Sequence, residues 1–206
     1  MQYPEKLVGP LILTLSLGFL FAPALIKSEA PVFRDTGHFY YPSMKWEQDQ
    51  WQSGEVPLWN QLENLGRPYL ADGSSSVFYP VKILFFLPLK YITTFTLYIA
   101  LHFVIAAIGS YWCAKRISGS SQGGLIACIS YTLGGCLLSL HCNLIYLVGA
   151  SWLPWAISAA FTLHQVPSIR SSARFAVPLS LMILGGDPQL AVHVLIVYSL
   201  ICLIAK

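Results

Sequence analysis

Charged side chains are scarce in this sequence of 206 residues: Asp, Glu, Lys and Arg make up only 10% of it, whereas 55% of the residues are hydrophobic. An average soluble domain has about 25% charged residues. The composition therefore argues against an ordinary soluble domain. It predicts an all-α integral membrane protein, in which each crossing helix needs about 20 mostly apolar residues.

The sequence also lacks the motifs of common soluble enzymes. It contains no glycine-rich phosphate-binding loop of the nucleotide-binding types and no metal-binding HExxH. Its five cysteines include no C-x-x-C pair and no His spacing typical of zinc ligands, so we interpret them as small residues that pack between helices. No feature of the sequence indicates a nucleic-acid partner.

Long apolar stretches account for most of the chain. Four of them contain no charged residue and are long enough to serve as spanning helices: 7–26, 93–113, 124–140 and 144–163. Residues 175–186 are too few to cross at about 1.5 Å per residue, so they predict a short or half-buried helix. With 188–205, this gives about six transmembrane or half-membrane helices. Segment 7–26 is longer than the usual signal-peptide core of about 7 to 15 residues, which favours a retained helix over the alternative of a cleaved signal peptide.

Basic residues indicate the orientation of these helices, because they gather on the cytoplasmic side of membrane proteins. They fall on alternate connections, at Lys6, Lys115, Arg116, Arg170, Arg174 and Lys206. The opposite side then receives eight of the nine acids, seven of them in one loop, 27–79. We therefore expect a multi-pass protein with a cytoplasmic N-terminus and a long extracytoplasmic loop. The domain boundaries that follow are a single membrane domain, 1–206, with helix 1 at 7–26, the loop at 27–79 and helices 2 to 6 in 80–206.

The long loop has its own local signals. Pro42 suits a first helical turn and Gly54 a termination, so residues 42–52 predict an interfacial amphipathic helix with an apolar stripe of Tyr41, Met44 and Trp51. Its many aromatic side chains suit anchoring at the headgroup level. Residues 81–88 are interpreted as a re-entrant stretch that leads into the second spanning helix.

Asp35 is the first candidate for chemistry. It follows the first membrane helix by only about nine residues, beside Arg34 and near His38, where a lipid headgroup would lie. A carboxylate there can act as a general base. The alternative is an acid that only caps the following segment.

Asp187 is the second candidate, in the run GGDPQ at residues 185–189. An ionisable group below a membrane surface is costly and usually functional, and Gln189 is expected to face the same cavity. The alternative is that Asp187 caps the final helix. We further expect Asp35 and Asp187 to border one cavity, roofed by helix 42–52 and walled by Trp152 and His141.

Several runs together resemble a known family: FYYP, then GEVPLWNQLENLGRPYLADGSSSVFYPVKILFFLP, then LHFVIAAIGSYWCAKRISGS, ASWLPWA and GGDPQLA. They are similar to the bacterial YfhO-like membrane proteins, within the GT-C class of glycosyltransferases. The likeness extends from about Asp35 to Gln189. Arg34 stands where the family has glycine, and Asp187 where it has histidine. The family's proteins are longer, so the resemblance implies that this chain corresponds to their N-terminal portion.

The resemblance implies a membrane glycosyltransferase of the bacterial cytoplasmic membrane, which takes its sugar from a polyprenyl-phosphate donor on the extracytoplasmic side. It implies Asp35 as the catalytic acid. The expected substrate-binding residues are Arg34, His38, Arg67, His141, Asp187 and Gln189. No cofactor is certain, and a divalent metal and further membrane subunits are left open.

Two other functions remain open from the sequence. The first is a non-catalytic lipid-binding or assembly subunit that keeps the loop for contact with the membrane. The second is a small transporter, for which the sequence offers only His102 and His193 at depth within helices. Histidines in such positions, His141 included, are often held by hydrogen bonds between helices.

Overall fold

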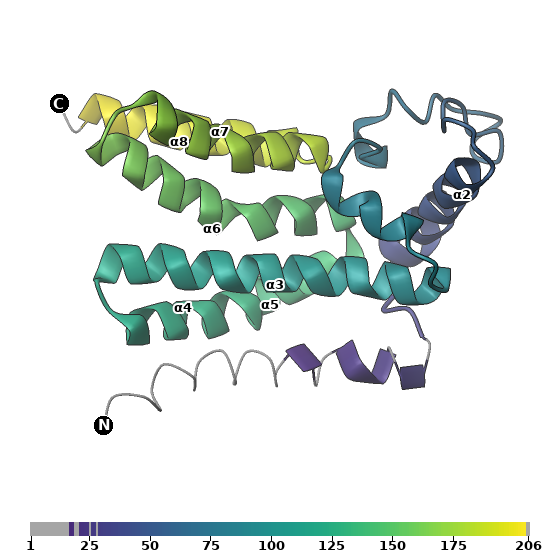
Figure 1. Ribbon diagram of the computed structural model, residues 1–206, viewed down its shortest axis with the longest axis horizontal. Coiled ribbons are helices and arrows are strands. Elements are labelled where there is room, and N and C mark those ends of the chain that lie inside the picture. The colour runs from purple at the N-terminus through teal and green to yellow at the C-terminus, as the bar shows by residue number, and fades with distance from the viewer. Residues whose placement is uncertain (1–16, 19–20, 25, 28, 205–206) are drawn as a thin grey trace.

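The computed structural model describes residues 17–18, 21–24, 26–27 and 29–204. Over these residues the chain forms helices and no β-strand, apart from one isolated bridge between Asn60 and Arg67. The helices α3, α4, α6, α7 and α8 lie roughly parallel in a bundle, and α2 and the irregular loop cover one end of it (Figure 1). The all-α prediction is confirmed for the part of the chain described.

The bounds of the elements follow in chain order: η1 (Thr36–Tyr40), α2 (Tyr41–Gln52), η2 (Gly73–Ser75), η3 (Pro80–Phe86), α3 (Tyr91–Ser118), α4 (Ser121–Thr132), α5 (Gly135–Ser139), η4 (Leu140–Cys142), α6 (Leu144–Gln165), α7 (Ile169–Leu184) and α8 (Pro188–Ile204).

Three helical stretches are long and apolar enough to cross a membrane. They are α3 with 28 residues, the stretch Ser121–Cys142 with 22 residues, and α6 with 22 residues. The helix α8 is apolar but shorter, with 17 residues. The predicted helix 7–26 lies largely outside the described residues, and the count of six spans stays a prediction.

The start of α7 differs from the prediction of a helix at 175–186. The helix begins at Ile169 because Ser168 forms a capping box with Ser171, whose backbone N–H donates to Ser168 Oγ at 3.1 Å. Such a cap satisfies backbone donors that the first turn leaves free. The sequence interpretation missed it because the first two turns of α7 contain the basic residues Arg170 and Arg174 and few apolar ones.

The predicted helix at 42–52 is confirmed as α2, and Gly54 follows its end with a positive φ of 80°. Its expected apolar stripe is wrong. Met44 is buried, but Glu47 and Gln48 are buried with it, whereas Tyr41 and Trp51 are only half-buried. This face packs against η3 and the loop, so it is directed toward protein. The expected re-entrant stretch 81–88 is largely the 3-10 helix η3.

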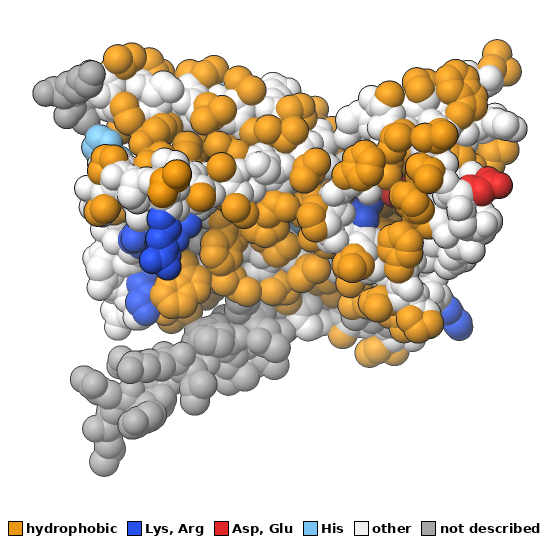
Figure 2. All heavy atoms as spheres, turned by 45° about the horizontal axis from the view of Figure 1, so that its top comes forward, with side chains coloured by type: hydrophobic (Ala, Val, Ile, Leu, Met, Phe, Trp, Pro, Cys, Tyr) orange, Lys and Arg blue, Asp and Glu red, His pale blue; other side chains and the backbone are white. Residues whose placement is uncertain are grey.

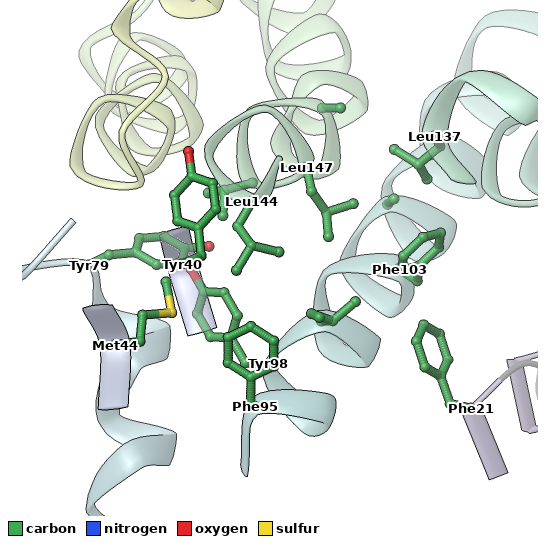
Figure 3. Packing of buried hydrophobic residues seen from close by; sticks show 14 of the residues in the cluster. Phe21, Tyr40, Met44, Tyr79, Phe95, Tyr98, Phe103, Leu137, Leu144 and Leu147 are labelled. Atoms are coloured by element: carbon green, nitrogen blue, oxygen red, sulfur yellow. The ribbon is translucent and has the colours of Figure 1, made fainter. Parts of the chain in front are cut away.

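One hydrophobic core joins the loop to the bundle. Tyr40 and Met44 from the loop side lie against Tyr98 of α3 and Leu144 of α6 (Figure 3). Farther along α3, Phe21 packs against Phe103 with ring centroids 5.4 Å apart. Because the core is shared, the loop has a fixed position on the end of the bundle.

The surface of the bundle is mainly hydrophobic, and Lys and Arg side chains gather near the end of the bundle away from the loop (Figure 2). Lys115 and Arg116 lie in the last turn of α3, at this end. Hydrophobic side chains also cover much of the loop. This distribution is compatible with helices that contact lipid.

Candidate functional site

Asp187 lies in the turn between α7 and α8, at the end of the bundle that the loop covers (Figure 1). Its carboxylate accepts a hydrogen bond from the backbone N–H of Leu190 at 3.0 Å, which makes it the cap of α8. Only 4% of the residue is exposed, and burial raises the pKa of its carboxyl group, which the Leu190 N–H partly offsets. Asp187 is therefore both a helix cap and a buried titratable group.

Two glycines make room for this turn. A Cβ on Gly149 of α6 would collide with the Asp187 carboxylate, so the acid lies directly against the backbone of α6. Gly186 has a φ of 95°, and a Cβ there would be 2.9 Å from Ser76 Oγ in the loop. The loop thus packs onto the turn that carries Asp187, as a polar cover over a buried acid.

A cavity of about 240 Å³ adjoins Asp187 and is lined by Tyr146, Asp187, Gln189, Leu190 and His193. A second cavity, of about 420 Å³, runs between α6 and α8 and reaches Ile117 of α3. Its lining is apolar except for His164, His193 and the hydroxyl of Tyr198. The two cavities share Leu190 and His193, so a polar pocket continues into an apolar groove.

Asp35 lies on the surface at the start of η1, and its neighbours come from the turn before α6. Asn143 Nδ2 lies 3.4 Å from Asp35 Oδ2, and Tyr40 Oη donates to Asn143 Oδ1 at 2.8 Å. Thr36 Oγ1 donates to the carbonyl oxygen of His141 at 2.5 Å. The Asp35 side chain makes no hydrogen bond that caps η1. The structure therefore does not support the alternative in which Asp35 is only a helix cap.

Of the predicted site residues near Asp35, the structure brings His141 close and leaves Arg34 and His38 exposed. The His141 ring lies beside Phe33, with ring centroids 6.5 Å apart. Arg34 has a φ of 51°, an unusual value for a residue with a side chain. No interaction of Arg34 or His38 fixes its side chain among the described residues.

Arg67 is placed elsewhere, within the loop. It pairs with Glu63, with 2.9 Å between Nε and Oε2, and with Asp72, with 2.8 Å between Nη1 and Oδ2. Its guanidinium also stacks over the rings of Phe39 and Tyr69, at 4.9 and 5.4 Å from their centroids. Two carboxylates already balance its charge, so this geometry favours a role in holding the loop rather than in binding a phosphate.

The expectation that one cavity borders both Asp35 and Asp187, with His141 and Trp152 in its walls, is wrong. The pocket beside Asp187 contains neither Asp35 nor His141 nor Trp152 in its lining, and α2 lies over a different cavity. Tyr40 lies near Asp35, because its hydroxyl donates to Asn143, which also contacts Asp35. Burial, then the nearby Asp35 carboxylate and Tyr146, raise the pKa of the Tyr40 hydroxyl well above its usual range. Tyr146 in turn lines the pocket of Asp187.

Sequence reasoning missed a buried charged pair under the loop. Lys82 Nζ lies 2.5 Å from Glu47 Oε2, and Tyr69 Oη donates to the same carboxylate oxygen at 2.9 Å. Lys82 also donates to the carbonyl of Ser75. The signal in the sequence was the lone lysine in the apolar run VKILFFLP, which needs a partner if the run is buried.

A second missed group lies deeper, where the loop meets α3 and α6. Tyr79 Oη is 2.8 Å from His102 Nε2, and Trp152 Nε1 donates to Tyr79 Oη, also at 2.8 Å. The other ring nitrogen of His102 lies 2.7 Å from the carbonyl oxygen of Tyr98. His102 is thus fully engaged in hydrogen bonds between elements, in agreement with the structural alternative for this histidine.

Among the residues that the structure describes, no three His, Cys, Asp or Glu side chains converge as ligands for a metal ion. No protein-family model matches this chain, no curated protein matches it, and no solved structure does. The fold and the site therefore show only the general class of the protein. Over the described residues it is all-helical, with three helices long and apolar enough to cross a membrane and an ordered loop over one end of the bundle.

Proposed function

We propose that this protein is a multi-pass protein of the bacterial cytoplasmic membrane that transfers a sugar from a polyprenyl-phosphate donor on the extracytoplasmic side. The observation that carries the proposal is the polar pocket of Asp187 and its continuation into the apolar groove between α6 and α8. Such a shape suits a molecule with a polar head and a long apolar chain. The YfhO-like sequence runs favour a lipid-linked sugar as that molecule.

The positions of the acids support a division of roles. The N-terminal ends of α6 and α8 lie at the same end of the bundle, under the loop (Figure 1). Asn143 at the first of these ends contacts Asp35, and Asp187 caps the second. In the proposed arrangement Asp187, Gln189 and His193 contact the polar head, while Asp35 faces the solvent from which an acceptor arrives.

The proposed reaction is a single displacement. Asp35 removes the proton from an acceptor hydroxyl, whose oxygen forms a bond to the anomeric carbon as the bond from that carbon to the phosphate oxygen breaks. The anomeric configuration inverts, and the polyprenyl phosphate leaves with the electron pair. Arg34, exposed beside Asp35, supplies positive charge for the developing phosphate, and His38, also exposed there, supplies a hydrogen-bond donor.

The test is sugar transfer from a labelled polyprenyl-phosphate sugar by the purified protein in proteoliposomes. General-base help is worth about 10²- to 10⁴-fold in rate, so Asp35→Asn should reduce transfer by that factor. Asp49→Asn is the matched control, since Asp49 is another exposed acid of the loop, paired only with Lys45. Equal rates for Asp35→Asn and wild type would rule out Asp35 as the base.

The alternative function is a non-catalytic lipid-binding or assembly subunit. The same groove supports it, because binding a lipid chain requires no base. One comparison distinguishes the two functions. The alternative predicts that wild-type protein binds the labelled donor but transfers no sugar to any acceptor. Donor retention with no transfer, by wild type and Asp35→Asn alike, would favour the alternative.

A further inference from the structure

A third cavity lies away from both acids, between α2 and η3, and has a volume of about 190 Å³. Three residues that are each at most 4% exposed form its polar part: Glu47, Gln48 and Lys82. Aromatic rings form much of the remaining wall, among them Trp51, Phe78 and Phe86. Buried polar side chains are costly unless they are hydrogen-bonded.

The polar part is held rigidly by hydrogen bonds. Lys82 Nζ contacts both Glu47 Oε2 and the carbonyl of Ser75, and Tyr69 Oη donates to Glu47 Oε2 at 2.9 Å. Gln48 Nε2 donates to the carbonyl of Phe85 at 2.8 Å, which fixes the orientation of its amide. Among the described residues nothing donates to Glu47 Oε1 or to Gln48 Oε1. These two oxygens are free to accept hydrogen bonds from a ligand.

The charges of this cavity cancel. Lys82 and Glu47 form a pair, and burial raises the pKa of the Tyr69 hydroxyl well above its usual range, so Tyr69 stays neutral. An anion would meet the Glu47 carboxylate, and a cation would meet the Lys82 ammonium, each at a distance where like charges repel strongly in a buried place. The cavity therefore selects a neutral ligand that donates hydrogen bonds.

The aromatic walls of the cavity narrow the chemical class of the ligand further. The C–H groups on the faces of a pyranose ring carry partial positive charge and are attracted to the negative faces of aromatic rings. Its hydroxyl groups donate to carboxylate and amide oxygens. A volume of 190 Å³ holds about six water molecules at about 30 Å³ each, which is comparable to the bulk of one monosaccharide ring.

We propose that the cavity between α2 and η3 binds one neutral pyranose ring, with Glu47 and Gln48 as hydrogen-bond acceptors and Phe78 and Trp51 as stacking surfaces. This site is separate from the pocket of Asp187. Its occupation requires neither the groove between α6 and α8 nor Asp35. The binding of a free sugar ring can therefore be tested without any transfer reaction.

The experiment is saturation-transfer NMR on the purified full chain in detergent micelles, with methyl pyranosides as probes and with choline and inorganic phosphate as comparison ligands. We expect transfer to at least one methyl pyranoside, no transfer to choline, and no loss of the sugar signal when inorganic phosphate, which has no C–H proton to observe, is added as a competitor. Phe78→Ala is the informative variant, because Phe78 is 67% exposed and its removal should leave the fold intact. Loss of one stacking ring should weaken binding by about three- to tenfold.

Phe33→Ala is the matched control, since Phe33 is also an exposed phenylalanine, at 61%, and lies outside this cavity. It should bind the sugar as wild type does. Three results would each overturn the proposal: no transfer to any methyl pyranoside, displacement of the sugar by choline or phosphate, or equal weakening by Phe33→Ala and Phe78→Ala. None of them depends on whether the protein transfers sugar.

Discussion

The buried pair of Lys82 and Glu47 gives a prediction that can be worked out from the structure. Both residues are 4% exposed, and their charged atoms are 2.5 Å apart. Lys82→Met leaves the Glu47 carboxylate buried with only the Tyr69 hydroxyl as a donor, whereas Glu47→Gln leaves the Lys82 ammonium without a counter-charge. Breaking a buried pair from one side costs about 3–5 kcal/mol, so each single variant should lose about that much unfolding free energy.

The double variant Lys82→Met/Glu47→Leu should behave differently. The free-energy cost of taking both charges out of water opposes the attraction between them. The pKa of Lys82 shows both effects, because burial lowers it and the Glu47 carboxylate raises it. Removing both charges therefore removes the desolvation cost together with the pair. We expect the double variant to recover most of the loss, to within about 1 kcal/mol of wild type.

The assay is the free energy of unfolding of the purified protein in detergent, with cleavage of the loop by proteinase K, which does not require Lys or Arg, as a local measure. Lys45→Met is the control, because Lys45 pairs with Asp49 on the surface and an exposed pair contributes about 0–1 kcal/mol. If both single variants are as stable as Lys45→Met, or if the double variant is less stable than either single one, the reasoning about this pair is refuted.

Three further predictions concern the helices and their ends. Gly109→Ala should destabilise the contact between α3 and α6 by about 1–3 kcal/mol, measured by thermal unfolding, because its Cβ would lie 2.5 Å from Trp155 Nε1; a variant as stable as wild type would contradict this packing. Gly186→Ala should cost about 1–3 kcal/mol from its φ of 95° and should make loop cleavage by trypsin faster, because its Cβ would press on Ser76; unchanged cleavage would show that the loop does not pack on this turn. Because the folded-state pKa of Asp187 is raised, its ionisation lowers stability as pH rises above the usual range of a carboxyl group; Asp187→Asn, which keeps a good cap, should match wild type at acidic pH and be more stable at neutral pH, and a constant difference across that range would contradict the raised pKa.

Much of the helical layout could be predicted from the sequence, because long uncharged runs permit few structures. The stretches 93–113 and 144–163 lie within α3 and α6, whereas 124–140 is divided between α4, α5 and the start of η4, with a break at Leu133 and Gly134. The helix at 42–52 was also predictable, from Pro42 at its start and Gly54 after its end. Local rules of chain stiffness and hydrogen bonding determine these features, and they act between residues that are close in sequence.

The faces of the helices could not be predicted in the same way. The apolar stripe expected on α2 was wrong because Glu47 and Gln48 turn inward, toward partners on η3 that lie 35 and 37 residues away. A polar side chain can be buried when such a distant partner satisfies it, and no local pattern indicates which one it is. Arg67, expected to bind substrate, instead pairs with Glu63 and Asp72, which lie only four and five residues away in the sequence.

The candidate site was only partly predictable. Asp187 could be singled out from GGDPQ, and its capping of α8 was foreseen as the alternative to a functional acid. The groove between α6 and α8 could not be foreseen, since its apolar lining looks in the sequence like any membrane helix. Whether Asp35 and the residues around it take part in catalysis stays a prediction.

The most direct test of the proposed function is to find where a polyprenyl phosphate binds. The purified protein in proteoliposomes would be labelled with a photoreactive polyprenyl phosphate, and the modified residues would be identified by mass spectrometry. The account predicts that labels concentrate on the groove, at residues such as Leu153, Ile157, Val194 and Val197, and that unlabelled polyprenyl phosphate in excess suppresses them. Labels spread evenly over the outward faces of α3, α4 and α7, with no suppression by the unlabelled lipid, would contradict it.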